Sequence, residues 1–487
     1  MTRGKTTEHT VITYYGTFID TPKFGEIRIR HNTAIGVCMK SKDHSIKSGT
    51  IIFIIENCSD PYIETLQFDP TLTENDIKIV KYSDSRKTCF YFPGFIDTHI
   101  HASQYPNCGI IGDNSTLLDW LNTYTFPTES ALKHLPYASQ VYSKIVTNTL
   151  QNGTTTASYF TTIDLESSKL MAKICSDLGQ RALIGKVCMD RNSPDYYIEN
   201  TKESVHSLMK LISYIENDLD DSLVKPIITP RFAPSCSSSL MSEIGKIAKT
   251  EDLHIQTHLS ENFDEIKWVK NLFPDCENYT DVYRKNDLLS RKTILAHSIH
   301  LSKEEINIIK ETQAGISHCP ISNTTLSSGE CPIKQMYLDG LHKIGLGTDV
   351  SAGYSCSILE AARAAYAVSR HLAIRQNDPI CKLTVKECLY LATMGGAKVL
   401  DMEQTIGSFE IGKKFDCQEI QLQSSQSKID FFEWQVPNIS SVVKKKPKLD
   451  VQLSEFDSNE ILSKWFFNGD DRNVVNVWVN GINASVI

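Results

Sequence analysis

The sequence lacks several features that would place the chain in a specialised class. Its 14 cysteines are scattered over 487 residues without any C-x-x-C pair, whereas disulfide scaffolds are short and dense in cysteine. No apolar run is long enough to span a bilayer, and the N-terminal residues include no apolar segment of the kind found in secretory signals. We therefore expect a chain without a membrane partner, in the reducing cytoplasm, with most thiols free and buried.

The chain also lacks an excess of positive charge. Its 50 lysines and arginines are outnumbered by 58 aspartates and glutamates, which gives a formal net charge of −8. This balance disfavours nucleic acid or an anionic membrane surface as the main partner. A hydrophobic content of 41% over this length is sufficient for a large barrel and a smaller accompanying domain.

Short apolar runs alternate with longer amphipathic segments from residue 94 onward. The segments between the runs, such as "SKEEINIIKETQ", carry apolar residues at helical spacing. Eight strands that alternate with helices predict an α/β fold, a closed (β/α)8 TIM-like barrel over residues 92–409. We interpret the following runs as its strands: 94–101, 154–160, 181–189, 225–232, 253–258, 292–297, 314–319 and 342–349.

The two ends of the chain have a different character. Residues 1–91 contain runs of β-branched and aromatic residues separated by polar turns, and no segment there has helical periodicity. Runs with the composition of β-strands occur again within 410–487, so we expect the two ends of the chain to form one discontinuous, β-sandwich-like domain. The stretch 418–462 is the least readable, and we interpret its basic run "KKKPK" at 444–448 as a solvated loop rather than a nuclear address.

The pattern "THIH" ends the first predicted barrel strand. Because successive strand residues alternate between two faces, His99 and His101 point the same way and Ile100 points the other way. Two imidazoles on one face suit a metal chelate, although an isolated H-x-H pair is a weak signal. Barrel enzymes place their chemistry at the carboxyl ends of the strands, so the other strand ends test this interpretation.

Other predicted strand ends carry residues that can bind a metal. The fifth strand ends at His258, the sixth at His297 and the eighth at Asp349. One such histidine alone would be interpreted as a core residue, but the set of strand ends favours a metal centre. Three imidazoles, one carboxylate and a water suit zinc, while iron or a similar divalent ion is an alternative.

Three further polar residues accompany this set. Glu261 lies shortly after His258, in a loop that should cover the metal, and could move a proton from water to a substrate nitrogen. The fourth strand ends in Arg231 rather than in a lysine that could bridge two ions, so we expect one metal per chain. Arg231 and Gln104 suit the edge of an amide-like heterocycle. The plainer alternatives are a solvated loop glutamate for Glu261 and a surface salt bridge for Arg231.

Several segments together resemble the amidohydrolase superfamily and, within it, the guanine deaminase family. The segments most specific to that family are "HASQYPN", "LDWLNTYTFP" and "PRFAPSC", whereas the H-x-H and "TD" elements occur throughout the superfamily. The resemblance covers about 91–412 well and 418–462 hardly at all. It implies hydrolytic deamination of guanine to xanthine and ammonia, in purine catabolism or salvage, by a homodimer with one zinc ion per chain.

The resemblance also implies a role for each candidate residue. His297 would orient the attacking water, Glu261 would pass a proton to the ring, and Glu261 or Asp349 would protonate the departing amine. Trp120 and Phe126 could cover the purine or merely pack. The purine would be held by Gln104, Arg231 and Phe232, and the metal would be bound by His99, His101, His258 and Asp349.

One departure from the family and two alternative functions remain at this point. Ile321 stands where relatives commonly carry asparagine, while Asn323 is kept, so we expect local repacking and an unchanged reaction type. Another single-metal amidohydrolase could act on 8-oxoguanine, a triazine or an adenosine-like thioether. A catalytically silent scaffold is the other alternative, although such barrels normally lose metal ligands. A cytidine-type zinc deaminase is excluded, because the chain has neither H-x-E nor P-C-x-x-C.

Overall fold

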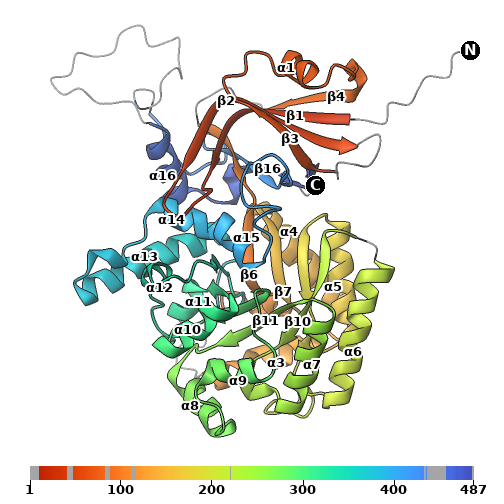
Figure 1. Ribbon diagram of the computed structural model, residues 1–487, viewed down its shortest axis with the longest axis vertical. Coiled ribbons are helices and arrows are strands. Elements are labelled where there is room, and N and C mark those ends of the chain that lie inside the picture. Colours follow the sequence, from red (N-terminus) through yellow and green to blue (C-terminus); the bar gives the residue numbers. More distant parts are fainter. Residues whose placement is uncertain are drawn as a thin grey trace, which may run out of the picture.

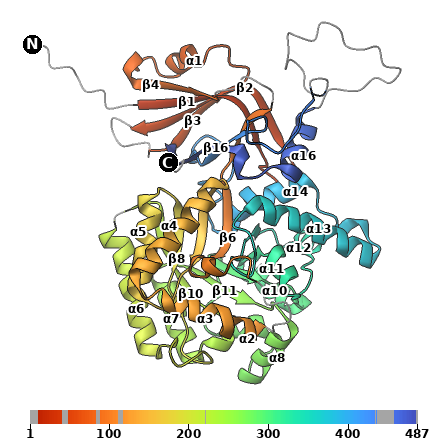
Figure 2. The same cartoon turned by 180° about the vertical axis from the view of Figure 1, so that it is seen from behind.

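The computed structural model describes residues 10–40, 48–82, 88–110, 117–219, 221–432, 435 and 457–484. These residues form a barrel surrounded by helices and a smaller sheet that lies against one end of it (Figures 1 and 2). The basic run at 444–448 lies outside the described residues.

Eight parallel strands form the barrel in the order of the chain, within the described residues. Backbone hydrogen bonds from Asp349 N–H to the His99 carbonyl (2.9 Å) and from His101 N–H to the Val350 carbonyl (3.2 Å) join the loop after the last strand to the first strand. The expected fold class is therefore confirmed. The strands are β6 (Phe95–His101), β7 (Thr154–Phe160), β8 (Arg181–Gly185), β10 (Val224–Pro230), β11 (His254–Leu259), β12 (Thr293–His297), β13 (Gly315–His318) and β14 (Ile344–Leu346).

Several predicted strand ends differ from the structure by one or two residues: β10 ends at Pro230 rather than in Arg231, and β11 ends at Leu259 rather than at His258. Two other strand predictions differ more. The run predicted at 181–189 is divided into β8 and the short β9 (Val187–Cys188), which pair with successive parts of β10. The prediction that Asp349 ends the eighth strand is wrong, because β14 already ends at Leu346. Asp349 follows that strand end and has φ 49°, a left-handed conformation outside the range of regular strands, so this carboxylate is presented by a loop.

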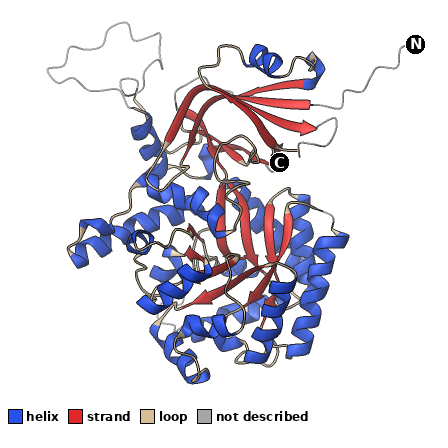
Figure 3. Ribbon diagram, viewed as in Figure 1, coloured by secondary structure: helices blue, strands red, loops and turns tan. Residues whose placement is uncertain are grey.

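Helices surround the strands of the barrel (Figure 3), and α10 (Lys303–Thr312) illustrates how capping residues set where a helix begins and ends. The predicted helical segment "SKEEINIIKETQ" forms this helix. The side chain of Ser302 caps its first turn together with Glu305, and Gln313 ends it in a left-handed conformation. Other helices of this outer layer are α4 (Leu135–Gln151), α5 (Leu165–Asp177), α6 (Thr201–Ser213), α7 (Ser238–Thr250), α8 (Phe263–Leu272) and α13 (Ile358–Gln376).

The two ends of the chain share one mixed sheet, at the top of Figure 1. The N-terminal strand β5 pairs antiparallel with the C-terminal strand β15, which joins the two ends directly. The strands are β1 (Thr10–Asp20), β2 (Arg28–Lys40), β3 (Thr50–Ile55), β4 (Ile77–Lys81), β5 (Cys89–Pro93), β15 (Cys417–Gln421), β16 (Val474–Val479) and β17 (Ile482–Asn483).

Two helices also belong to the terminal parts, α1 (Pro61–Phe68) and α16 (Ser458–Asn468). The expectation that no helix occurs before residue 91 is wrong. Within α1 only Pro61 and Thr65 are buried, so the helix has no apolar stripe that a periodicity search could find. Its start is instead marked by Asp60, whose carboxylate accepts hydrogen bonds from two backbone N–H groups of the first turn.

The cysteines agree with the expectation of free thiols. None of the 14 cysteines, all of which are described, forms a disulfide, and most are buried. Among the described helices, none combines the length and apolar character that crossing a membrane would require.

A buried ion pair joins the sheet to the barrel. Arg181, at the start of β8, donates from Nε and Nη2 to the Asp416 carboxylate at 3.1 and 3.2 Å. Its Nη2 also donates to Asn480 Oδ1 at 2.9 Å, and the Asn480 N–H donates to Asp416 Oδ1 at 2.8 Å. Because Arg181 lies at the starting end of its strand, the terminal sheet is fastened to the end of the barrel opposite the strand ends named above.

We predict that Arg181→Met lowers the free energy of unfolding by about 3 kcal/mol, because it leaves the buried Asp416 carboxylate without its cation. Chemical denaturation of the purified chain measures this loss. The matched control is Lys173→Met, which removes an exposed pair with Asp177 and should leave the unfolding midpoint nearly unchanged. An Arg181→Met chain as stable as the parent would show that this pair does not hold the two parts together.

Candidate metal centre and substrate pocket

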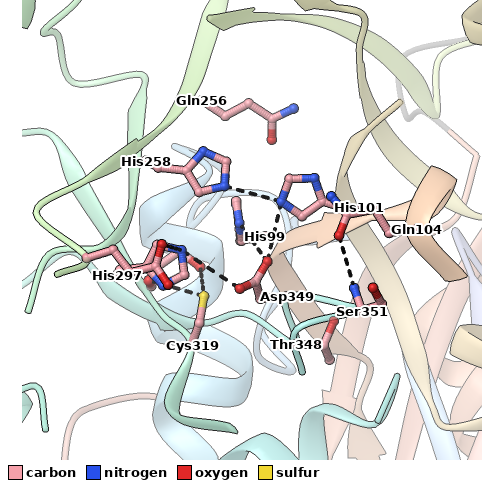
Figure 4. Close-up of polar contacts among 12 residues, drawn as sticks. His99, His101, Gln104, Gln256, His258, His297, Cys319, Thr348, Asp349 and Ser351 are labelled. Atoms are coloured by element: carbon pink, nitrogen blue, oxygen red, sulfur yellow. Dashed lines mark hydrogen bonds and ion pairs between the residues drawn. The ribbon is translucent and has the colours of Figure 1, made fainter. Parts of the chain in front are cut away.

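Four imidazoles and one carboxylate meet at the carboxyl end of the barrel (Figure 4). Asp349 Oδ1 lies 3.2 Å from Nε2 of His99 and 3.3 Å from Nε2 of His101. The Nε2 atoms of His101 and His258 are 3.2 Å apart. The structure therefore brings the four predicted metal ligands together, although they come from β6, β11 and the loop after β14.

The fourth imidazole, that of His297, is as close as the predicted ligands. Ligand atoms of His99, His258, His297 and Asp349 all lie within 4.8 Å of one another, a set that could hold a metal ion. His101 is outside this set but is tied to it by its short distances to His258 and Asp349. Nε2 of His297 lies 3.8 Å from both Asp349 Oδ2 and Glu261 Oε2, between the cluster and the predicted proton carrier.

Neighbouring acceptors fix which ring nitrogen faces the cluster. Nδ1 of His258 donates to the Arg231 carbonyl at 2.5 Å, and Nδ1 of His297 donates to Asn323 Oδ1 at 2.8 Å. Both rings therefore turn Nε2 toward the cluster, and in a neutral ring such as that of His258 this nitrogen is unprotonated, the form that binds a metal. Both ring nitrogens of His99 and Nδ1 of His101 are buried without a hydrogen-bond partner. Such buried polar atoms are costly, so a metal ion fits the chemistry of this donor set.

Charges in the cluster agree with this arrangement. Burial lowers the pKa of His99 to about 4 and that of His258 well below its usual value, so both rings are neutral near pH 7. Burial alone would raise the pKa of Asp349, but the adjacent His101 and His99 side chains hold it well below its usual value. His99 and His258 thus present neutral imidazoles beside the Asp349 carboxylate, the states that ligands require. The pKa of His297 moves the other way: burial alone would lower it, but the charges of Glu261 and Asp349 raise it.

Glu261 is buried beside the cluster, so it is not a solvated loop residue. Its Oε1 accepts a hydrogen bond from the Ser328 hydroxyl at 3.0 Å, and its Oε2 is the oxygen that faces His297. Its backbone N–H donates to Glu265 Oε2 at 2.8 Å. Burial raises the pKa of Glu261, which suits a carboxyl group that takes up and releases a proton near neutral pH.

A pocket opens over the cluster. All four predicted substrate-binding residues line it, whereas Phe126 is not among the lining residues and instead packs against the Arg231 guanidinium, with 5.2 Å between Cζ and the ring centroid. The pocket is lined by Gln104, Trp120, Leu121, Arg231, Phe232, His258, Glu261, His297, Leu326, Asp349 and Ala352.

Sequence reasoning missed Glu129 of α3 (Phe126–Ala131), which is completely buried behind the pocket. Its carboxylate accepts hydrogen bonds from Arg231 Nη1 at 2.8 Å, Gln104 Nε2 at 3.0 Å and the Tyr197 hydroxyl at 2.7 Å. Burial would lower the pKa of Arg231, but Glu129 outweighs this effect and raises it. The ion pair of Arg231 is therefore internal, not at the surface. Glu129 follows the segment "LDWLNTYTFP" closely, but no spacing rule assigns it a role.

Asp97 was also missed. Its carboxylate accepts hydrogen bonds from the N–H (3.1 Å) and hydroxyl (2.5 Å) of Thr348 and from the His99 N–H (3.1 Å). Burial raises its pKa to about 7. Asp97 thereby holds the loop that carries Asp349 against β6. The one available signal was its place in "FIDTHIH", on the strand face shared by His99 and His101.

Ile321 and Asn323 both lie in α11 (Pro320–Thr325) and are buried. Asn323 contacts His297, and the Ile321 side chain is buried in the interior. The local repacking expected around Ile321 stays a prediction.

Comparisons with known proteins agree on one family. The sequence pattern of the amidohydrolase family matches residues 90–483. A probable guanine deaminase of Schizosaccharomyces pombe is 43% identical over 97% of this chain and 83% of its own length. The guanine deaminase of Homo sapiens is 46% identical over 80% of this chain and 82% of its own. A crystal structure of guanine deaminase from C. acetobutylicum with bound guanine in the active site has a TM-score of 0.81 at 32% identity, over 97% of this chain and 100% of that one.

We predict that His258→Ala reduces the bound divalent metal from about one ion per chain to almost none, because a cluster that loses one imidazole binds too weakly to survive dialysis. Elemental analysis of the dialysed protein measures the ratio. The matched control is His254→Ala at the start of the same strand, where the ring contacts the Leu400 carbonyl, and this variant should keep its metal. A full metal complement in His258→Ala would remove His258 from the ligand set.

Proposed function

The chain belongs to the amidohydrolase family and, within it, to the guanine deaminases, and we propose that it hydrolyses guanine to xanthine and ammonia with one zinc ion per chain. The observation that carries this proposal is the buried carboxylate of Glu261, set between the imidazole–aspartate cluster and a pocket edged by Gln104 and Arg231. A hydrolytic deaminase needs these three elements side by side: a metal centre, a proton carrier and a polar wall that orients the ring.

The donor set supports zinc as the metal. Imidazole nitrogens and one carboxylate suit this ion, and we assign His99, His101, His258 and Asp349 as its ligands. A zinc ion held there would lower the pKa of a bound water to about 7 and so supply a nucleophile at neutral pH. His297, with its Nδ1 bound to Asn323, directs Nε2 at the same space and orients the attacking water.

Glu261 moves the protons of the reaction. Its Oε1 is held by Ser328, so Oε2 is the oxygen available to accept a proton from the attacking water. The proton passes to ring N3 while the water oxygen bonds to C2 of guanine. The proton that remains on the C2 hydroxyl then passes through Glu261 or Asp349 to the 2-amino group, so that the C2–N bond breaks with release of ammonia and the oxygen becomes the C2 carbonyl of xanthine. One water is consumed for each guanine converted to xanthine and ammonia.

The pocket walls suit a flat purine. Arg231 supplies hydrogen-bond donors, Gln104 supplies an amide, and Phe232 and Trp120 supply ring faces. The reaction would place the enzyme in purine catabolism or salvage. Its cytoplasmic location and its assembly as a homodimer stay predictions.

The direct test measures xanthine formation from guanine and the zinc content of the same sample. We expect turnover of guanine and about one zinc per chain, with weaker activity on 8-oxoguanine, a triazine and an adenosine thioether. Ammonia release from one of those rings without turnover of guanine would favour another single-metal amidohydrolase. A metal-free protein that stays inactive after addition of zinc would favour a scaffold.

We predict that Glu261→Gln keeps its zinc but lowers kcat by about 10²- to 10⁴-fold, because the amide cannot accept and return a proton. Steady-state kinetics with guanine and zinc analysis of the same preparation measure both effects. The control is Glu305→Gln, which changes a buried glutamate that caps the remote helix α10 and should leave kcat unaltered. Retention of most activity in Glu261→Gln would refute its assignment as proton carrier.

A further inference from the structure

We propose that Glu129 sets the hydrogen-bond polarity of the purine pocket, so that the pocket accepts a lactam edge and rejects an amino-imine edge. A lactam edge carries a ring N–H next to a carbonyl oxygen, and an amino-imine edge carries a bare ring nitrogen next to an amino group. The inference rests on the proposed function for the class of ring that is bound, and it assigns Glu129 as a positioning residue that does not itself line the pocket.

Glu129 is an acceptor surrounded by donors. Its Oε1 accepts from Gln104 Nε2 at 3.0 Å and from Arg231 Nη2 at 3.3 Å. Its Oε2 accepts from Arg231 Nη1 at 2.8 Å and from the Tyr197 hydroxyl at 2.7 Å. An ionised carboxylate has no proton to donate, so every neighbour must turn a donor toward it. Arg231 forms a buried ion pair with this carboxylate, with 2.8 Å between Nη1 and Oε2.

This constraint decides the orientation of the Gln104 amide. Its NH2 group must face Glu129, so its carbonyl oxygen faces the other way, where the Ser351 N–H donates to it at 3.4 Å (Figure 4). A flipped amide would direct its oxygen at the Glu129 carboxylate and its NH2 group at the Ser351 N–H, two repulsive contacts. An amide oxygen has two lone pairs, so Gln104 presents a fixed acceptor to the pocket.

The same carboxylate fixes the Arg231 guanidinium. Two of its nitrogens are directed at Glu129, and its plane packs against the Phe126 ring. All groups that remain on the guanidinium are donors. The wall of the pocket therefore carries an acceptor from Gln104 and donors from Arg231, and neither side chain can exchange its role while Glu129 stays charged.

This order of groups complements one kind of ring edge. A 6-oxopurine presents N1–H to an acceptor and O6 to a donor, and both bonds can form. A 6-aminopurine presents a bare N1 and an amino group, so the ring acceptor would meet the Gln104 oxygen and the amino donor would meet the guanidinium. Pockets built to hydrogen-bond one pattern reject the mismatched ring by about 100-fold or more, because buried polar groups are left unpaired.

Binding of hypoxanthine and adenine to the zinc-loaded protein tests the inference. Hypoxanthine carries the lactam edge without the 2-amino group, so its binding is measured without turnover of guanine. Titration calorimetry should give a Kd for hypoxanthine about 100-fold below that for adenine in the parent chain. Glu129→Gln, whose neutral amide both donates and accepts, frees Gln104 to turn, and the ratio of the two Kd values should narrow at least tenfold. Equal binding of the two rings by the parent, or an unchanged ratio in Glu129→Gln, would overturn the inference.

Tyr197→Phe is the matched control, since it removes one hydrogen bond from Glu129 but leaves both bonds to the pocket side chains. Both Kd values should stay within about threefold of the parent values. A change in the ratio for Tyr197→Phe as large as that for Glu129→Gln would show general loosening of the buried cluster, and the inference would fail.

A second variant protects the test if Glu129→Gln does not fold, because it leaves the buried Arg231 without its counter-ion. Gln104→Met keeps the Glu129–Arg231 pair and removes only the fixed acceptor. Its affinity for hypoxanthine should fall about tenfold while that for adenine stays constant or rises. An equal loss for both rings would mean that Gln104 supplies only contact area, which contradicts a fixed polarity.

Guanine turnover by the parent chain separates this inference from the proposed function. If the protein discriminates hypoxanthine from adenine through Glu129 but does not deaminate guanine, the role assigned to Glu129 is supported and the proposed function is wrong. If the protein deaminates guanine but binds hypoxanthine and adenine equally well, the proposed function is supported and the role assigned to Glu129 is wrong.

Discussion

The closure of the barrel between its last and first strands is the constraint on which the site depends. Backbone hydrogen bonds join the loop after β14 to β6, and Asp97 adds side-chain bonds to Thr348, 251 positions away in the sequence. The contact that completes the sheet therefore also carries Asp349 to within 3.2 Å of His99. Loosening this closure would separate the ligands even with every ligand side chain intact, so Asp97 acts on the centre through geometry alone.

Closure of the barrel buries many polar groups. One buried cluster is fully hydrogen-bonded within the protein, and a second cluster contains atoms without a hydrogen-bond partner. Around Glu129 every oxygen is paired within the protein, which leaves Gln104 and Arg231 fixed in position and in hydrogen-bond role. In the imidazole cluster, both ring nitrogens of His99 lack a hydrogen-bond partner. A fully paired network suits a wall that recognises a ring, whereas an unpaired donor set suits an ion supplied from outside. The two clusters adjoin at the pocket.

The sequence predicted the barrel and the convergence of its ligands because both follow from strong local rules. Alternation along a strand put His99 and His101 on one face, and the rule of carboxyl ends linked them to His258 and His297. The position of Asp349 was predicted less well, because a left-handed loop conformation has no signature in an aspartate. The role of Glu129 was not predicted from the sequence at all. Its role depends on Gln104 and Arg231, which lie 25 and 102 positions away and meet it only in the folded chain.

The two ends of the barrel have different roles, one in stability and the other in chemistry. At the starting ends of the strands, the terminal sheet is fastened by the buried pair of Arg181 and Asp416, and Trp465 of α16 stacks against Phe95. At the carboxyl ends, His297 and Asp349 have left-handed backbones, with φ of 65° and 49°, which cost free energy for residues with a Cβ atom. Strained backbone and unpaired imidazoles lower the stability of a site, so the contacts that stabilise the fold must lie elsewhere. The buried pair of Arg181 and Asp416 is such a contact, and neither residue lines the pocket. Substitutions in the loops around the pocket can therefore change the hydrogen-bond pattern that a bound ring must have, while the strands that hold the metal ligands keep their positions.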